Sequence, residues 1–263
     1  MVAGAREQFG RQAAHYGRDA IFAQGSTLEL ALAHLGDGPW ETALDVATGA
    51  GHMALRLAAR ARRVIGLDPV PAMLDEARRG AAAGEGGNVE WVEGWAEELP
   101  FANGSFDLVT CRIAAHHFSD ARRAVREMAR VLRRGGRALV IDTCAPAEND
   151  LDTFLNRLEA VRDPSHRRDY KVAEWFSFFA AANLRLSHWE FGLLERRMDF
   201  AGWVKRAGTP PERVDELRRM LAGAPAPVVA ALGLETSRRD GESTFAIPMG
   251  LFVATKGTPF EEP

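Results

Sequence analysis

The chain contains little cysteine, and its two cysteines, Cys111 and Cys144, each lie in an apolar, strand-like run. This placement argues against a disulfide framework and fits a reducing compartment. The chain also lacks an apolar run of the roughly 18 residues that a membrane span needs. Its first residues, MVAGAREQFGRQAAHYGRD, contain no long apolar segment typical of a secretory signal. We therefore expect a cytoplasmic protein with no membrane partner.

An excess of positive charge is missing as well. Lysine and arginine number 33 against 36 acidic residues, and the formal net charge is -3. This balance gives no support for nucleic acid as a partner. The Arg-rich stretch DARRAVREMARVLRRGG mixes both signs, which is typical of a solvated helix face. We expect a small-molecule partner, and the sequence is compatible with a homodimer.

Strands and helices are predicted to alternate through the first half of the chain. The runs ETALDVA, RRVIGLD, NVEWVEG, SFDLVTCRI and RALVIDTC are typical of strands. Helices are predicted at 53–61, from Pro71, and at 120–133, where Gly135 and Gly136 would end the helix. This alternation predicts an α/β fold with a doubly wound, mostly parallel, seven-stranded Rossmann-like sheet.

The second half is predicted to complete this sheet. LRLSHWEFGLLERR would form a long strand, and STFAIPMGLFVATK would form an antiparallel last strand beside it. We expect a single domain over 1–263. It would comprise N-terminal lid helices (1–36), with Ser26 or Thr27 capping the second, and a cofactor-binding core (37–146). The next segment (147–242) would contain the sixth strand and substrate-side helices inserted after the fifth strand, with AGAPAP (222–227) as a loop. The last strand (243–256) would follow.

A glycine-rich turn follows the first predicted strand. Gly49-Ala50-Gly51-His52-Met53-Ala54 fits the G-x-G-x-x-G/A fingerprint of dinucleotide sites. Glycine lets the chain turn sharply and lets a ligand approach the backbone. Asp68 ends the second strand, where an acid is expected to accept hydrogen bonds from ribose hydroxyls. A dinucleotide and a lone adenosine would both suit this pattern.

Asp45, just before the turn, favours one of these two ligands. A pyrophosphate at a helix N-terminus is stabilised by amide donors and opposed by a nearby carboxylate. S-adenosylmethionine carries an ammonium group and no phosphate, so an acid at this position would attract it. The alternative is that Asp45 only caps the turn.

Four ordered segments resemble successive motifs of a known family. LDVATGAGHMAL, VIGLDPVPAMLDEAR, LPFANGSFDLVTCRIAAHHFSD and MARVLRRGGRALVIDTCAP resemble those of class I S-adenosylmethionine-dependent methyltransferases. The similarity is greatest to the ubiquinone/menaquinone-biosynthesis-like (methyltransferase type 11) subgroup, and it extends from about Phe9 to Lys256. It implies S-adenosyl-L-methionine as cofactor and S-adenosyl-L-homocysteine as product. It does not identify the acceptor, because this scaffold hosts many.

The resemblance also implies cofactor-binding residues. Asp45 would lie near the methionine ammonium, and Asp68 would take the ribose hydroxyls. Trp95 stands where the family has an acid, and its indole would stack on the adenine instead. Arg112 and His117 would lie on the cofactor side, with His116 packed inward. The other residues implied are Ala47, Thr48, Gly49 and Gly51 along the methionyl and ribose part, and Pro69, Met73 and Ala96 around the adenine. Ala47 replaces a family glycine and would need only slightly more room.

His116 and His117 are the candidate catalytic residues. They follow the fourth strand at the ligand edge, and the pKa of histidine lies near working pH. Either could deprotonate a phenol, an amine or an activated carbon, and the alternative is packing under the next helix. A base is needed only if the nucleophile holds a proton, because methyl transfer depends mainly on alignment.

The remaining candidates concern the lid and the acceptor pocket. Phe9, Gln12 and Tyr16 would fold over the cofactor. Apolar walls with a few polar contacts are typical of small-molecule sites. The candidate wall residues are Phe154, Leu158, Arg162, His166, Trp175 and Phe179, for which ordinary core packing is the alternative. Asp142 would face the substrate or cap its loop. We expect no metal site, since the histidines, His52 and His166 included, show no ligand spacing.

These observations predict methyl transfer to a small acceptor, an aromatic or polyketide-like secondary metabolite, at oxygen, carbon or nitrogen. An NAD-linked oxidoreductase is the alternative that the glycine fingerprint leaves open. A second alternative is a protein that binds S-adenosylmethionine and uses the sulfonium for a non-methylating reaction such as cyclisation.

Overall fold

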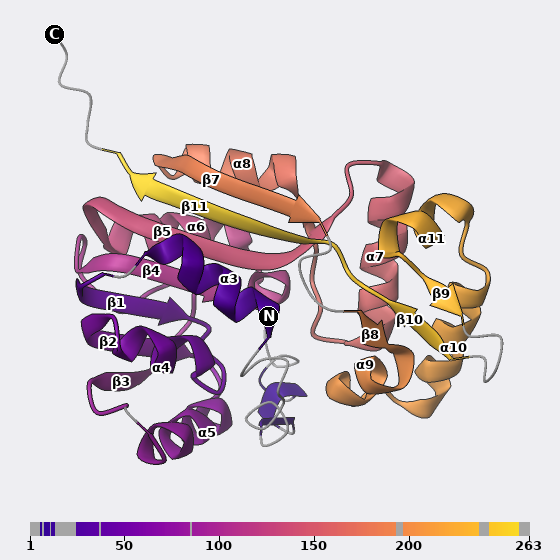
Figure 1. Ribbon diagram of the computed structural model, residues 1–263, viewed down its shortest axis with the longest axis horizontal. Coiled ribbons are helices and arrows are strands. Elements are labelled where there is room, and N and C mark those ends of the chain that lie inside the picture. Colours follow the sequence, from indigo (N-terminus) through magenta and orange to yellow (C-terminus); the bar gives the residue numbers. More distant parts are fainter. Residues whose placement is uncertain are drawn as a thin grey trace, which may run out of the picture.

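The central sheet has the strand order β3-β2-β1-β4-β5-β11-β7 (Figure 1). Five strands run parallel: β1 (Trp40–Val46), β2 (Ala61–Asp68), β3 (Val89–Glu93), β4 (Phe106–Arg112) and β5 (Leu132–Ala145). β11 (Met249–Lys256) lies antiparallel between β5 and β7 (Leu184–Gly192). The short β6 (Tyr170–Lys171) pairs with the end of β5. The predicted Rossmann-like sheet and its antiparallel last strand are confirmed.

The computed structural model describes residues 6, 8–10, 12–13, 25–36, 38–84, 86–192, 197–236 and 242–257. The described residues of the first predicted helix are helical, whereas Tyr16 and half of the predicted lid (1–36) lie outside the described residues. Within the described ranges, no helix combines the length and apolar character needed to cross a membrane. Cys111 and Cys144 are both buried free thiols.

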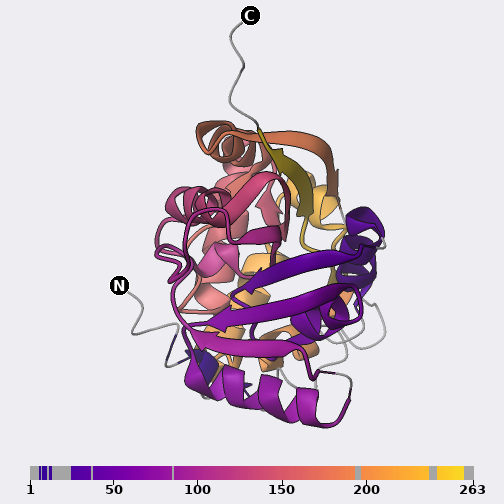
Figure 2. The same ribbon diagram turned by 90° about the vertical axis from the view of Figure 1, so that its left-hand side faces the viewer.

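Helices cover both faces of the sheet because its strands are apolar on both sides. In β1, Ala43 packs on the side of α3 (Ser26–Leu35) and α4 (His52–Ala58), while Leu44 and Val46 face α6 (Ala121–Val131) and α8 (Val172–Ala181). The helix α5 (Pro71–Ala82) covers β2 and β3. Figure 2 shows the twisted sheet between its helices.

A second group of elements, which we call the cap, lies beside the carboxyl ends of the parallel strands (Figure 1). It consists of α7 (Asn149–Arg162), α9 (Phe200–Ala207), α10 (Pro211–Ala222), α11 (Ala226–Leu232) and a small sheet of β8 (Met198–Asp199), β10 (Ser243–Phe245) and β9 (Glu235–Thr236). Leu158, Trp203 and Phe245 are buried in its own apolar core. The helical insertion after β5 is confirmed, and most of the cap is inserted later, between β7 and β11.

Four local predictions were wrong. The segment 243–256 forms β10 and β11, in different sheets, with Pro248 in the break between them, where the missing N–H prevents continuous pairing. The predicted loop 222–227 is shorter, because α11 begins at Ala226. Gly135 and Gly136 lie inside β5, which starts directly at Leu132, so they do not end the preceding helix. In α3, Gly25 is the N-cap, and neither Ser26 nor Thr27 caps it.

The two fingerprint glycines are required for different reasons. A Cβ on Gly51 would lie 2.6 Å from the Trp91 ring and 2.9 Å from the Cβ of Ala77, so this glycine allows α4 to pack against its neighbours. A Cβ on Gly49 would meet nothing within 4 Å. Both residues have positive φ, +54° for Gly49 and +84° for Gly51. Both positions therefore favour glycine, but only at Gly51 would a side chain also clash with its neighbours.

We predict that Gly51→Ala lowers the free energy of unfolding by more than Gly49→Ala does. Both variants bear the left-handed backbone cost of about 1–2 kcal/mol. Gly51→Ala adds overpacking of about 1–3 kcal/mol against the Trp91 ring. Urea denaturation of the two variants beside the parent measures the difference. Equal losses would contradict the packing role assigned to Gly51.

Candidate functional site

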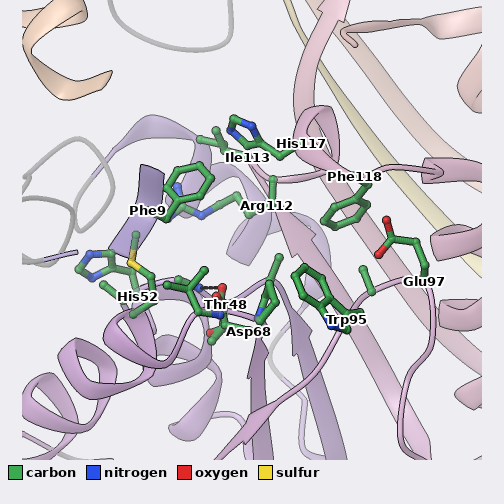
Figure 3. A pocket seen from close by; sticks show the side chains of 18 of the residues that line it. Phe9, Thr48, His52, Asp68, Trp95, Glu97, Arg112, Ile113, His117 and Phe118 are labelled. Atoms are coloured by element: carbon green, nitrogen blue, oxygen red, sulfur yellow. Dashed lines mark hydrogen bonds between the residues drawn. The ribbon is translucent and has the colours of Figure 1, made fainter. Parts of the chain in front are cut away.

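An open cavity with about 950 Å³ of empty space lies where β1, β2 and β4 end. Figure 3 shows Asp68 and Trp95 on one side of it and Phe9, His117 and Phe118 on the other. Most of the residues predicted to bind a cofactor line it: Ala47, Thr48, Gly49, Asp68, Pro69, Met73, Trp95, Ala96 and Arg112. The sheet edge therefore brings together residues that lie far apart in the sequence.

Two predicted cofactor residues, Asp45 and Gly51, do not line the cavity. Asp45 is buried behind the cavity, where it accepts hydrogen bonds from the hydroxyls of Thr48 (2.6 Å) and Thr110 (2.7 Å). Burial raises the pKa of Asp45 above its usual value. Gly51 packs on Trp91 and does not line the cavity, and Tyr16 lies outside the described residues. Thr48 thus connects the Asp45 carboxylate to the cavity.

The Asp68 carboxylate is fixed at the cavity wall by two backbone amides. It accepts from Gly49 N and Val70 N, each at 2.9 Å. Burial raises the pKa of Asp68 to about 6, so the group is mainly ionised at neutral pH. Each carboxylate oxygen has a further lone pair, so two ligand hydroxyls can still be accepted.

Ala47 adopts a left-handed backbone conformation, with φ of +54°. Its replacement of glycine therefore has a conformational cost in addition to the steric one that we expected. Ile113, also at φ +54°, is more unusual, because β-branched residues rarely adopt positive φ. Backbone strain of this kind is concentrated at functional sites. Both residues line the cavity.

Glu97, Phe118 and Ser119 line the cavity beside Trp95, and Arg6 lies against the Trp95 ring. The Arg6 guanidinium lies 5.3 Å from the centre of the Trp95 ring. Glu97, which the sequence analysis did not identify, accepts from the amide (2.8 Å) and the hydroxyl (2.6 Å) of Ser119. Phe118 adds an apolar wall. The signal in the sequence that could have identified Glu97 as a cavity residue is its position two residues after Trp95.

A second cavity, with about 760 Å³ of empty space, extends from the first toward the cap. The two cavities share Phe9, Ile113 and His117. The other lining residues come from β5, α7, the loop after it and the cap: Thr143, Glu159, Arg162, Asp163, Met198, Trp203 and Arg206, with His116, Ile247 and Met249. His117 therefore lies at the junction of the two cavities.

His116 is held inward by Asp142. Its Nδ1 lies 2.5 Å from Asp142 Oδ1, and its backbone N–H donates to Asp142 Oδ2 at 3.0 Å. Burial opposes a charge on the ring, but the Asp142 carboxylate outweighs it and raises the pKa of His116 to about 9. Asp142 is fully buried and lines neither cavity, so its predicted role facing the substrate is wrong. It accepts from Thr143 N and anchors His116.

His117 is part of a short hydrogen-bonded chain. Its Nδ1 lies 3.1 Å from Ser165 Oγ, and that hydroxyl donates to Asp163 Oδ1 at 2.6 Å. Because the serine proton is directed at the carboxylate, His117 Nδ1 is the donor, and Nε2 keeps its lone pair. Burial and the charge on His116 lower the pKa of His117 to about 3. At neutral pH, His117 is therefore an uncharged hydrogen-bond acceptor.

The predicted wall residues separate into two groups. Arg162 lines the second cavity. Trp175 and Phe179 pack with Phe252 in the core, and Phe154 and Leu158 belong to the core of the cap. His166 is buried, with Nε2 3.2 Å from Asn156 Oδ1, and burial lowers its pKa to about 2. Of the predicted lid residues, Phe9 lines both cavities and contacts His117 edge-on at 4.8 Å between ring centres.

Comparison with known proteins gives consistent matches. The family described as a methyltransferase domain matches residues 44–140. The uncharacterized methyltransferase YcgJ of Bacillus subtilis is 39% identical over 209 residues, which cover 80% of this chain and 82% of YcgJ. The YcgJ crystal structure superposes with a TM-score of 0.82 at 34% identity, covering 88% of this chain and 98% of that one. A demethylmenaquinone methyltransferase of Deinococcus radiodurans is 43% identical over 106 residues, 40% of this chain and 44% of that enzyme.

We predict that stability falls at alkaline pH because of His116. Its folded pKa of about 9 exceeds the ordinary 6.5, so its contribution is complete below pH 6.5 and is lost as the pH rises through 9. This shift corresponds to about 3 kcal/mol. Denaturant unfolding of the parent across this range should show the loss. In His116→Gln/Asp142→Asn, which removes both charges, the loss should be much smaller. An unchanged alkaline slope in the double variant would contradict the assignment.

Proposed function

Because this chain belongs to the S-adenosylmethionine-dependent methyltransferases, we propose that it methylates an aromatic or polyketide-like small molecule bound in the second cavity. Membership in this family also decides between the two cofactors that the fingerprint left open, in favour of S-adenosylmethionine and against NAD. The junction position of His117 is the observation that supports the proposal most directly, since an acceptor there would meet the cofactor cavity.

The residues of the first cavity suit this cofactor. The Cβ position of Gly49 is open, which leaves room for a ligand against the backbone, and the Asp68 carboxylate keeps lone pairs for ribose hydroxyls. Two buried carboxylates near the turn complement a positively charged ligand. The bound cofactor supplies an electrophilic methyl group on a sulfonium. We assign its methionyl and ribose part to Ala47, Thr48, Gly49, Asp68 and Arg112, with Asp45 acting through Thr48, and its adenine to Pro69, Met73, Trp95 and Ala96.

The second cavity suits an acceptor with a ring and polar substituents. Apolar side chains, among them Phe9, Met198 and Trp203, form much of its wall. Two of its lining residues have buried polar atoms without a hydrogen-bond partner among the described residues, Glu159 Oε1 and Trp203 Nε1. A buried acceptor atom and a buried donor atom of this kind call for partners. We propose that a hydroxyl and a carbonyl of the acceptor supply them.

We assign His117 the role of orienting the nucleophile. Its Nε2 lone pair can accept a hydrogen bond from a phenolic or enolic hydroxyl, and Ser165 and Asp163 fix the ring. The neighbouring His116 charge, with ring centres 4.0 Å apart, opposes full protonation of His117. His117 therefore aligns the acceptor hydroxyl, and the proton that this hydroxyl loses on methylation would pass through the Nε2 lone pair to solvent in the open cavity, because the His116 charge prevents His117 from keeping it. His116 acts as a positioning residue.

We predict that His117→Ala lowers kcat by at least about tenfold, because a positioned proton acceptor is lost. The affinity for S-adenosylhomocysteine should change by less than about threefold. Single-turnover rates and calorimetry measure the two effects. Ser165→Ala, which removes only the support of the ring, should give an intermediate rate. Equal single-turnover rates in His117→Ala and the parent would exclude the role.

We predict that Glu159→Gln raises KM for the acceptor about tenfold, because one hydrogen bond to a buried group is lost. kcat should change little, since we assign Glu159 to binding the acceptor and His117 to orienting the nucleophile. Glu216→Gln, an exposed change on α10, is the matched control. The assay uses cofactor with a deuterated methyl group and a panel of phenolic and polyketide-like acceptors, with product masses recorded. Conversion of an acceptor without transfer of the label would instead support the non-methylating reaction.

A further inference from the structure

Three side chains that belong to neither cavity meet on the α3 face of the sheet. His34 lies in the last turn of α3, and His188 and Glu190 lie on the edge strand β7. One ligand atom from each lies within 4.8 Å of the other two. The two imidazole rings stack with centres 4.4 Å apart, and Nε2 of both approaches the same oxygen, Glu190 Oε1, at 3.1 Å from His34 and 2.8 Å from His188.

The hydrogen bond of His34 to its own helix shows which of its ring nitrogens is available to a ligand. Its Nδ1 lies 2.9 Å from the carbonyl oxygen of Leu30, which can only accept, so Nδ1 carries a proton. In a neutral ring the lone pair of Nε2 would then point at the carboxylate oxygen of Glu190, and two acceptors would repel at 3.1 Å. A metal ion bound by both atoms would remove this repulsion, because each lone pair would then point at the ion.

We propose that His34, His188 and Glu190 form a binding site for a divalent first-row transition metal, with Zn²⁺ as the reference ion. Two imidazoles and one carboxylate with an open fourth position are a recognised zinc donor set. Ligand atoms about 2.0–2.1 Å from a tetrahedral ion lie roughly 3.3 Å apart. The spacings of the two histidines to Glu190 Oε1, 3.1 and 2.8 Å, therefore need to widen by only a few tenths of an ångström, and the ligand atoms of the two histidines lie within 4.8 Å of each other. The Leu30 carbonyl supplies the outer hydrogen bond that fixes a metal-bound histidine.

The exposure of the ligands supports reversible binding from solvent. The side chains of His34, His188 and Glu190 are 24%, 42% and 34% exposed, so an ion can enter and keep water in its remaining position. His188 and Glu190, two residues apart on a strand, point to the same face, and His34 approaches from across that face. An ion here would link α3 to the sheet edge. The other end of α3 contacts the cofactor cavity, where Arg112 donates to Thr27 Oγ1 at 3.2 Å.

The test uses the full chain without a purification tag, stripped with a chelator, and does not depend on the proposed reaction. Calorimetric titration with ZnCl₂ near neutral pH should show one ion per chain and a higher Tm with the ion present, because binding favours the folded state. Mg²⁺, which prefers oxygen ligands, should give neither effect. His188→Gln and Glu190→Gln should each weaken Zn²⁺ binding by at least about tenfold.

Glu90→Gln, an exposed change on the opposite edge strand β3, is the matched control and should bind Zn²⁺ like the parent. Binding of S-adenosylhomocysteine and the Tm of the stripped protein check that each variant folds. A parent that binds no Zn²⁺ would show that the three side chains form only a hydrogen-bonded cluster. Undiminished binding in both ligand variants would place the ion elsewhere, for example among the cavity histidines. Either result overturns the proposal.

Discussion

The buried pair of His116 and Asp142 is the interaction on which the site depends. It joins the loop after β4 to the end of β5, through both the side chain and the backbone of His116. Removing one partner of a buried ion pair typically costs about 3–5 kcal/mol, because the other charge is left uncompensated. The pair therefore fixes the direction of the loop. It also places a positive charge beside His117, which keeps that ring neutral and its Nε2 lone pair available.

The same loop shows how a strained backbone serves the site. Ile113 precedes the two histidines, lines both cavities and has positive φ, which a β-branched residue adopts only when its surroundings require it. Its N–H donates to the carbonyl oxygen of Ile141 at 2.7 Å, so the strain is held by the neighbouring strand. The anchor at Asp142 then holds the following residues. Together these contacts hold His117 between the two cavities. The loop would not keep this conformation without them.

The sequence predicts those features that depend on neighbours along the chain. The five strand runs of the first half, the glycine turn and Asp68 are local patterns, and each lies where expected. Features that depend on distant contacts were not predictable. The role of Gly51 depends on Trp91, and the inward direction of Asp142 depends on His116. His34 lies more than 150 residues from His188 along the chain, so no spacing rule could have joined them.

The division between the two cavities explains why the relatives identify the cofactor and leave the acceptor open. The family match covers residues 44–140, which include the end of β1, all of β2, β3 and β4, the first part of β5, the glycine turn and the loop with His117. The second cavity is built mainly from residues after this range, such as Glu159, Trp203 and Arg206, and most of them come from segments inserted into the sheet fold. Insertions can change without disturbing the sheet, because they have an apolar core of their own. We therefore propose that acceptor choice depends on the cap, whereas the chemistry common to the family depends on the strand ends.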